Sequence, residues 1–353
     1  MSPESIIDTV SICERVGASL GLVESEQEAR AGERLTAAER ALPPIAPEGR
    51  IVLLTGGTGL LGQRVARELR RSSFGVKVVA RRVPPPSRRV PGVEYVACDL
   101  GQGVDATLMK DVGLVVHAAA ETSGGQSEHQ RNSVDATRNL LTAAGKAGVK
   151  AFLHISSLAV LQPSRQLGRP IDEAAPVDAD SMRRGPYVWG KAESETLALR
   201  LGAELGVNVK IIRPGPLVDY AAFHPPGRLG REIGPIFVAV GPKRSALSVC
   251  DVSTAARVIR WYATQFADAP PLLNLVEAPP PTRHELLERY LKERPDLGTI
   301  WVPAIALRAM AAPLRLLQRV VLGARMPVDV AAAFASERYQ TALAAEIVVR
   351  ARD

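Results

Sequence analysis

The chain has 353 residues, which is enough for two domains or for one large α/β domain with an appended lobe. Apolar residues make up 46% and charged residues 23% of the chain, so a sizeable core is available and global disorder is excluded. A net charge of +7 suits phosphate-bearing small molecules or weak attraction to a membrane surface, whereas 4% aromatic residues leave few side chains for stacking on nucleic-acid bases.

Residues 1–48 are predicted to form a polar, mostly helical extension. Stretches rich in glutamate and arginine run to Arg40, and Pro43, Pro44 and Pro47 then break any helix. The simplest interpretation is a docking arm or a poorly ordered tail, and the alternative is a role in binding a specific partner.

Short apolar runs alternate with helical periodicity from Arg50 onward, which predicts a Rossmann-type doubly wound parallel sheet over residues 49–214. The predicted strands are Ile51–Leu54, Val76–Ala80, Tyr95–Cys98, Leu114–His117, Phe152–Ile155 and Val207–Ile212. The predicted helices are Gln63–Arg71, Val134–Ala147 and Lys191–Leu205.

Residues 215–353 are predicted to form a smaller, mainly helical substrate-binding lobe that is interleaved with the sheet. Asp251 can cap a helix over Ala255–Tyr262, and Thr282 and Glu285 have the spacing of a capping box. The remainder, with Val302–Leu322 and 328–345, is also predicted to be helical. The arginines of Val302–Leu322 fit a wall of the substrate pocket or, alternatively, a helix on a membrane surface.

A glycine-rich turn follows the first predicted strand directly. Three glycines spaced three apart permit a tight turn, close approach of backbone N–H groups to a pyrophosphate, and close packing of the next helix. The N-terminus of that helix then faces the phosphates. The motif predicts a dinucleotide site that contains Gly56, Thr58, Gly59, Leu60, Leu61 and Gly62.

The segment after the second predicted strand favours NADP(H) over NAD(H). An NAD enzyme usually places a carboxylate there to bind the ribose, but Gly75–Pro91 contains neither aspartate nor glutamate. Arg81 and Arg82 stand where a 2′-phosphate would lie. The alternative interpretation is a solvated basic loop.

Tyr187 and Lys191 lie four residues apart, on one face of a predicted helix. An ammonium near the phenol would lower the pKa of the tyrosine from about 10 toward neutrality, as proton transfer to or from a substrate hydroxyl requires. Ser157, at the end of the fifth predicted strand, could hold the substrate oxygen, or its hydroxyl could merely bond the backbone.

Together these motifs resemble the extended short-chain dehydrogenase/reductases, a superfamily of nucleotide-sugar epimerases, dehydratases and 3β-hydroxysteroid dehydrogenase-like reductases. The matching pieces, over residues 51–215, are the glycine turn, Asp99-Leu100, His117-Ala118-Ala119-Ala120, Ser156-Ser157, Tyr187 with Lys191, and Arg213-Pro214-Gly215. The resemblance covers the C-terminal lobe only loosely.

The resemblance implies a role for each matching residue. Asp99 and Leu100 would lie against the adenine, Ala118 and Ala119 would form a turn facing the cofactor, and Pro214 would pack beside the nicotinamide. Ser157 would orient the substrate oxygen, Tyr187 would act as general acid and base, and Lys191 would bind the nicotinamide ribose.

The sequence departs from the family pattern in two places. Asn132 stands one residue early relative to the family's Asn-Val-x-Gly-Thr segment, which puts the usual supporting asparagine in doubt. Leu158 and Ala159 follow the serine where sugar dehydratases carry an Asp-Glu pair, which argues against a dehydratase.

Other chemical groups are scattered. No metal site is predicted, because the five histidines do not cluster and Glu288 replaces the second histidine of a zinc motif that would begin at His284. Three distant cysteines, no recognisable secretory signal and no long apolar stretch predict a soluble, cytoplasmic protein.

The leading hypothesis is an NADP(H)-dependent oxidoreductase that interconverts a small-molecule secondary alcohol and ketone. A nucleotide-sugar epimerase using the same residues is the first alternative, and a non-catalytic NADP-sensing or scaffold protein is the second. A homodimer is expected by analogy with the resembling family.

Overall fold

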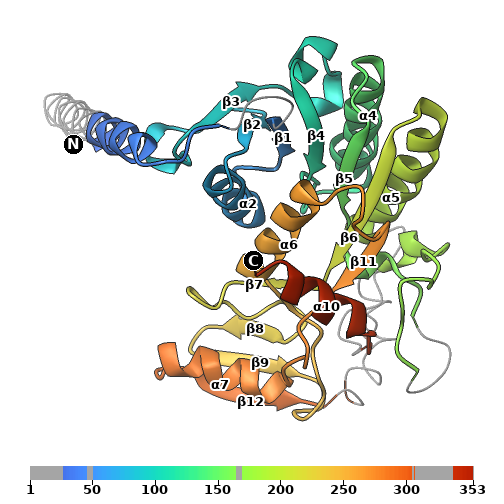
Figure 1. The fold of residues 1–353 in the computed structure, drawn as a ribbon. Helices are drawn as coiled ribbons and strands as arrows, with labels where there is room; N and C mark the ends of the chain where they lie inside the picture. Colours follow the sequence, from blue (N-terminus) through green and yellow to red (C-terminus); the bar gives the residue numbers. More distant parts are fainter. Residues whose placement is uncertain (1–26, 46–50, 164–168, 304–305, 307–336, 353) are drawn as a thin grey trace, which may run out of the picture.

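A computed structural model describes residues 27–45, 51–163, 169–303, 306 and 337–352 of the chain (Figure 1). Its centre is a seven-stranded sheet in the order β11-β6-β5-β4-β1-β2-β3, in which every neighbouring pair is parallel. The strands are β1 (Ile51–Thr55), β2 (Gly75–Ala80), β3 (Val93–Ala97), β4 (Val112–His117), β5 (Ala151–Ile155), β6 (Asn208–Pro214) and β11 (Leu272–Leu275). This confirms the predicted Rossmann-type sheet.

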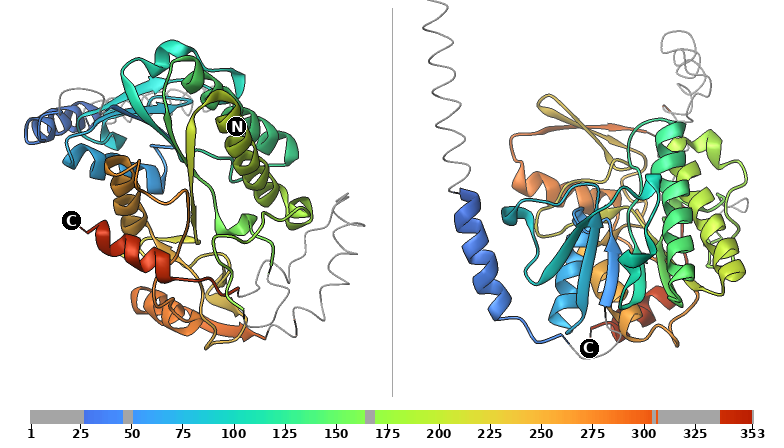
Figure 2. Two further views of the ribbon diagram at one scale, coloured as in Figure 1. Left: turned by 45° about the vertical axis from the view of Figure 1, so that its right-hand side comes forward. Right: turned by 90° about the horizontal axis from the view of Figure 1, so that it is seen from above.

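Helices cover both faces of the sheet, as the alternation of strand and helix predicts. One face carries α4 and α5, the other α2 and α6 with α10 beside them (Figures 1 and 2). Successive residues of β1 point to opposite faces, so Val52 and Leu54 enter the core under α2 and α6, and Leu53 the core under α4. The helices are α2 (Leu60–Arg71), α3 (Gln126–His129), α4 (Ala136–Lys146), α5 (Pro186–Leu205), α6 (Val252–Thr264) and α10 (Ala342–Arg350).

The helix ends follow local chemistry. Pro186 occupies the first turn of α5, where its missing N–H costs nothing, and Gly206 ends that helix with a left-handed φ of 62°. The carboxylate of Asp251 accepts from Thr254 N at 2.9 Å at the start of α6, and a capping box between Thr282 and Glu285 opens α7 (Arg283–Glu293). Both caps confirm the sequence expectation.

The C-terminal lobe contains more strand than the sequence indicates. In the described residues, α7 packs with a three-stranded sheet in the order β12-β9-β8, and β10 pairs with β7. These strands are β7 (Leu217–Val218), β8 (Gly230–Ile233), β9 (Ile236–Val240), β10 (Cys250–Asp251) and β12 (Gly298–Val302). In β8 only the glycine is buried and β12 is mostly exposed, so neither shows the apolar pattern of a core strand.

Two predicted segments are described only in part. Most of the predicted helices over Val302–Leu322 and 328–345 lies outside the described residues, although the end of the second overlaps α10. Residues 27–40 form the expected helix in the N-terminal extension, and residues 1–26 lie outside the described part. Within the described ranges, no helix is both long enough and apolar enough to cross a membrane.

Candidate functional site

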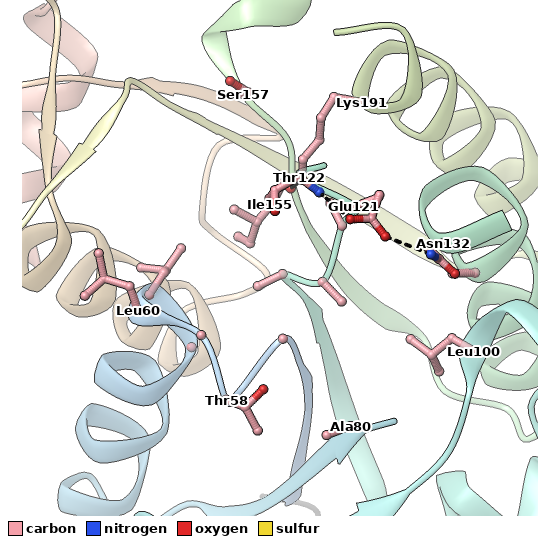
Figure 3. A pocket seen from close by; sticks show the side chains of 18 of the residues that line it. Thr58, Leu60, Ala80, Leu100, Glu121, Thr122, Asn132, Ile155, Ser157 and Lys191 are labelled. Atoms are coloured by element: carbon pink, nitrogen blue, oxygen red, sulfur yellow. Dashed lines mark hydrogen bonds between the residues drawn. The ribbon is translucent and has the colours of Figure 1, made fainter. Parts of the chain in front are cut away.

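A cavity of about 540 Å³ opens at the carboxyl ends of the strands, where the sheet order reverses between β1 and β4. Such a crevice is where doubly wound sheets bind ligands. Figure 3 shows Thr58 and Leu60 on one side of it, with Ser157 and Lys191 on the other. Of the predicted site residues, the cavity is lined by Gly56, Thr58, Gly59, Leu60, Leu61, Gly62, Arg81, Asp99, Leu100, Ala118, Ala119, Ser157, Tyr187, Lys191 and Pro214.

The glycine turn leaves no room for side chains. Gly56 has a φ of 72°, and a Cβ placed on it would lie 2.8 Å from Ala119 N. A Cβ on Gly62 would lie 2.1 Å from the carbonyl oxygen of Gly56, so α2 starts directly against the turn. The turn between β1 and α2 is therefore a backbone cradle that borders the cavity, which is the geometry a pyrophosphate needs.

A buried histidine joins this cradle to the turn after β4. Thr55 Oγ1 accepts from Ala119 N at 3.1 Å and lies 2.7 Å from Nδ1 of His117. Nε2 of the same ring lies 2.9 Å from Thr137 Oγ1, which donates to Ser133 O. This order of donors fits a neutral ring with its proton on Nε2. Burial, together with the charge of a nearby lysine, lowers the pKa of His117 to about 3, so the ring is uncharged at neutral pH and serves as a structural link.

The two arginines expected at a 2′-phosphate are both exposed at the end of β2, but only one borders the cavity. Arg81 lines it beside Ala80, whereas Arg82 is not among the lining residues. Asp99, which follows the neighbouring strand β3, also lines the cavity, forms an ion pair with Arg131 and accepts from Gly101 N at 3.1 Å. Arg81 and a carboxylate that already has partners thus border this part of the cavity.

Helix α5 carries both Tyr187 and Lys191 to the opposite end of the cavity. Tyr187 and Ser157 both line the cavity, and Ser157 Oγ accepts from Ala159 N at 3.1 Å. The serine hydroxyl therefore bonds the backbone, which is one of the two roles that the sequence left open, while the residue also borders the cavity.

The sequence predicted that Lys191 would lower the pKa of Tyr187, but the structure shows other groups acting on the phenol. Burial raises the pKa of Tyr187, while the neighbouring Ser157 side chain and the charge of Arg228 lower it. The Lys191 ammonium is buried and donates to the carbonyl oxygen of Ile155 at 2.7 Å, and burial lowers its pKa to about 8. In this structure, therefore, the serine and an arginine from the lobe, rather than the lysine, oppose the effect of burial on the phenol.

Sequence reasoning missed a glutamate that lines the cavity. Glu121 accepts from Asn132 Nδ2 at 2.8 Å and from the backbone N–H groups of Thr122 and Ser123 (Figure 3). Burial opposes ionisation, but these hydrogen bonds lower the pKa of Glu121 to about 2. Only its place four residues beyond His117 could have suggested it.

A π-helical turn accounts for the early position of Asn132. Residues Gln130–Asp135 form this turn between α3 and α4, and such a turn takes up one extra residue. Asn132 consequently lines the cavity although it is displaced in the sequence. Despite its early place in the sequence, this asparagine thus borders the cavity, which removes the doubt that the family pattern raised.

The other histidines form no metal site. The described residues contain no group of three or more side chains that could hold a metal ion. His154 is buried beside His117, and burial holds its pKa well below the usual value. His284 lies on the exposed face of α7, where its Nε2 is 3.4 Å from Glu288.

Comparisons with known proteins agree with the fold and the motifs. A sequence model of the NAD dependent epimerase/dehydratase family matches residues 52–233. A putative dihydroflavonol 4-reductase from Synechocystis is 29% identical over 166 residues, which are 46% of this chain and 47% of the relative. A ceramide reductase from Caulobacter vibrioides is 32% identical over 160 residues, or 42% of this chain and 50% of the relative. The chain thus spans about half the length of the curated relatives it matches.

Solved structures share the architecture over most of the chain. The structure of gox2253 has a TM-score of 0.68 at 22% identity and covers 85% of this chain and 92% of its own. MoeE5, solved with UDP-glucuronic acid and NAD, has a TM-score of 0.61 at 20% identity and covers 84% and 92%. At these identities the likeness concerns the fold.

Proposed function

The chain belongs to the NAD dependent epimerase/dehydratase family, and on that premise we propose that it is an NADP(H)-dependent oxidoreductase acting on a small-molecule secondary alcohol or ketone. Relatives named reductase and dehydrogenase support an enzyme of the short-chain dehydrogenase/reductase type. The observation that carries the proposal is that Ser157, Tyr187 and Lys191 line the same cavity as the glycine cradle.

The described residues fit a nicotinamide dinucleotide. The cradle at Gly56 and Gly62, which a Cβ would fill, offers backbone N–H groups to the pyrophosphate. Arg81 would bind the 2′-phosphate, and the N–H-bonded Asp99 would lie at the adenosine end. Lys191 and Pro214 line the end that would hold the nicotinamide. When bound, this group supplies or accepts a hydride.

The chain's own residues would handle the substrate oxygen and its proton. Tyr187 and Ser157 line the same end of the cavity, so a carbonyl oxygen placed between their hydroxyls would accept from both. The raised pKa of Tyr187 keeps the phenol protonated at neutral pH, as proton donation to a ketone requires. In the reverse direction the phenolate would accept the proton of the alcohol, and this reaction gains from higher pH.

Replacing Tyr187 with phenylalanine tests the proposal. We expect Tyr187→Phe to lower kcat by about 100-fold or more, because general acid–base catalysis contributes on the order of 10²–10⁴. The measurement is NADPH oxidation across a panel of ketones that the unaltered protein reduces. Tyr290→Phe is a matched control, since its hydroxyl bonds Glu232 in the lobe. Unchanged turnover in Tyr187→Phe would refute the proposed role.

Two related classes would give different results. An epimerase would convert a nucleotide-hexose without net turnover of the cofactor. A non-catalytic sensor would bind NADPH but reduce none of the panel. A cytoplasmic location and a homodimer stay predictions from the sequence.

A further inference from the structure

An N-terminal arm, defined as residues 27–45, lies beside the loop of residues 81–92 that joins β2 to β3 (Figures 1 and 2). Most of its helix over residues 27–40 is exposed, but Glu28, Ala31, Gly32 and Leu35 are half-buried. Their spacing of three to four residues defines one face of a helix. The arm therefore has a docking face, which was not evident from its polar sequence.

The first contact of this face is between Glu28 and Ser87. Ser87 N donates to Oε2 of Glu28 at 3.1 Å, and the Ser87 hydroxyl donates to the other carboxylate oxygen. The three residues before Ser87 are prolines, which have no N–H, so the carboxylate bonds the first backbone donor of this stretch. These two hydrogen bonds, and then the charges of Arg88 and Arg89, lower the pKa of Glu28.

The second contact is at the other end of the loop. Gly92 N donates to Oε1 of Glu39 at 3.0 Å, and Arg70 Nη2 on α2 donates to Pro43 O at 3.2 Å. Glu28 and Glu39 are about three helical turns apart and so share one face of the helix. The arm is therefore hydrogen-bonded to the loop at Ser87 and at Gly92, and to helix α2 at Arg70.

The loop that is held in this way carries the cations expected to recognise the cofactor. It contains four arginines, of which Arg81 lines the cavity. Like charges in one short loop repel one another, so the loop gains from fixed anions outside it. Ser87 and Gly92 are not among the residues that line the cavity, so the carboxylates bind the loop without occupying the site.

We infer that the N-terminal arm fixes the conformation of the loop of residues 81–92, and that Glu28 and Glu39 are positioning residues for recognition of a cofactor phosphate. The inference rests on the proposed preference for NADP(H). It assigns the arm a role in selecting the cofactor, in place of the simple docking element that the sequence suggested.

The test compares cofactor binding in variants of the full chain. Glu28→Ala removes the Ser87 contact, and Glu33→Ala is the matched control, an exposed glutamate on the same helix. We expect the Kd for NADPH to rise about 3- to 10-fold in Glu28→Ala, as the loss of one or two hydrogen bonds predicts. The Kd for NADH and both values in Glu33→Ala should stay unchanged. Cofactor fluorescence measures each Kd without turnover.

Two further measurements make the result decisive. Ser87→Ala removes the hydroxyl bond but keeps the backbone bond to Glu28, so it should raise the Kd less than Glu28→Ala does, and the double variant should bind NADPH as Glu28→Ala does. Amide hydrogen exchange at Ser87 and Gly92 should quicken in Glu28→Ala. If the Glu28→Ala and Glu33→Ala variants prefer NADPH over NADH to the same extent, the inference about the arm is wrong. A chain that binds both cofactors equally before any substitution overturns the proposed cofactor instead.

Discussion

Tyr187 shows how a group that lines the cavity can depend on a residue far away in the chain. Arg228 comes from the loop before β8 in the C-terminal lobe, yet its charge lowers the pKa of Tyr187 against the effect of burial. Among the described residues, no carboxylate forms an ion pair with this guanidinium. Its charge is thus available to the phenol.

This arrangement predicts the pH dependence of an Arg228 variant. The positive charge of Arg228 counteracts the rise in the Tyr187 pKa that burial causes. Removing this charge in Arg228→Gln should therefore raise the pKa of Tyr187 further. Alcohol oxidation needs the phenolate, and its rise with pH should therefore move to higher pH, whereas ketone reduction should persist to higher pH. The pH profile of kcat/KM in both directions measures the shift.

Arg231→Gln is the matched control, because Arg231 lies three residues further along the same segment and is exposed. A profile that moves to lower pH, or that moves equally in the two variants, would contradict the assigned electrostatic role of Arg228.

Residues that depend on local spacing could be predicted from the sequence, and residues that depend on folding could not. Tyr187 and Lys191 share a helix face, and their placement follows from a separation of four residues. Arg228 and Tyr187 are brought together only by packing of the lobe. The place of Asn132 at the cavity depends on a π-helical turn, which could not be predicted from the residue pattern.

At the scale of secondary-structure elements, the approach of α2 to the glycine turn limits what the cradle tolerates. Gly62→Ala would place a methyl group 2.1 Å from the carbonyl oxygen of Gly56, and backbone must move to admit it. We expect a loss of stability of about 1–3 kcal/mol, as overpacking typically gives, together with weaker binding of NADPH. Thermal unfolding and cofactor fluorescence measure the two effects.

Gly227→Ala provides the control, since a Cβ there would meet no heavy atom within 4 Å. If Gly62→Ala were as stable as Gly227→Ala and bound NADPH as tightly, the close approach described here would be wrong.

The sequence predicted six of the seven strands of the large sheet, and it missed the seventh, β11, together with the strands of the small sheet. Strands buried on both faces are continuous apolar runs, such as Ile51–Thr55, and stand out between helices. Strands β8 and β12 lie mostly at the surface, where exposed residues carry no periodic signal. Strand β11 is mostly buried, but it has only four residues and one of them is Asn274, so it gives no comparable apolar run.

At the scale of the whole molecule, the large sheet is completed by two elements that lie in sequence between β9 and α7 of the lobe. Strand β11 pairs with β6, and α6 packs on α2. Buried side chains of these two elements, including Ile259, Tyr262 and Leu273, belong to the same core as Val52 and Leu69.

The fragment of residues 49–214 should therefore not fold alone. Without β11 and α6, the apolar surface of α2 and the edge of β6 are left uncovered, which costs the fragment a large part of its core. We expect no cooperative thermal transition by circular dichroism and strong binding of a hydrophobic dye. A fragment of residues 49–275, which retains both elements, is the comparison. Cooperative melting of the shorter fragment would contradict this.

The chain passes repeatedly between the large sheet and the small one: outward after β6, back at α6, outward after β11 and back at α10. The first three of these passages lie wholly within the described residues and join the two sheets covalently. A wide hinge-like opening would strain these three connections together, so we expect the cleft to keep its width. The choice of substrate then depends on the side chains that border the cleft. Replacing these side chains should change the substrate preference without changing the reaction.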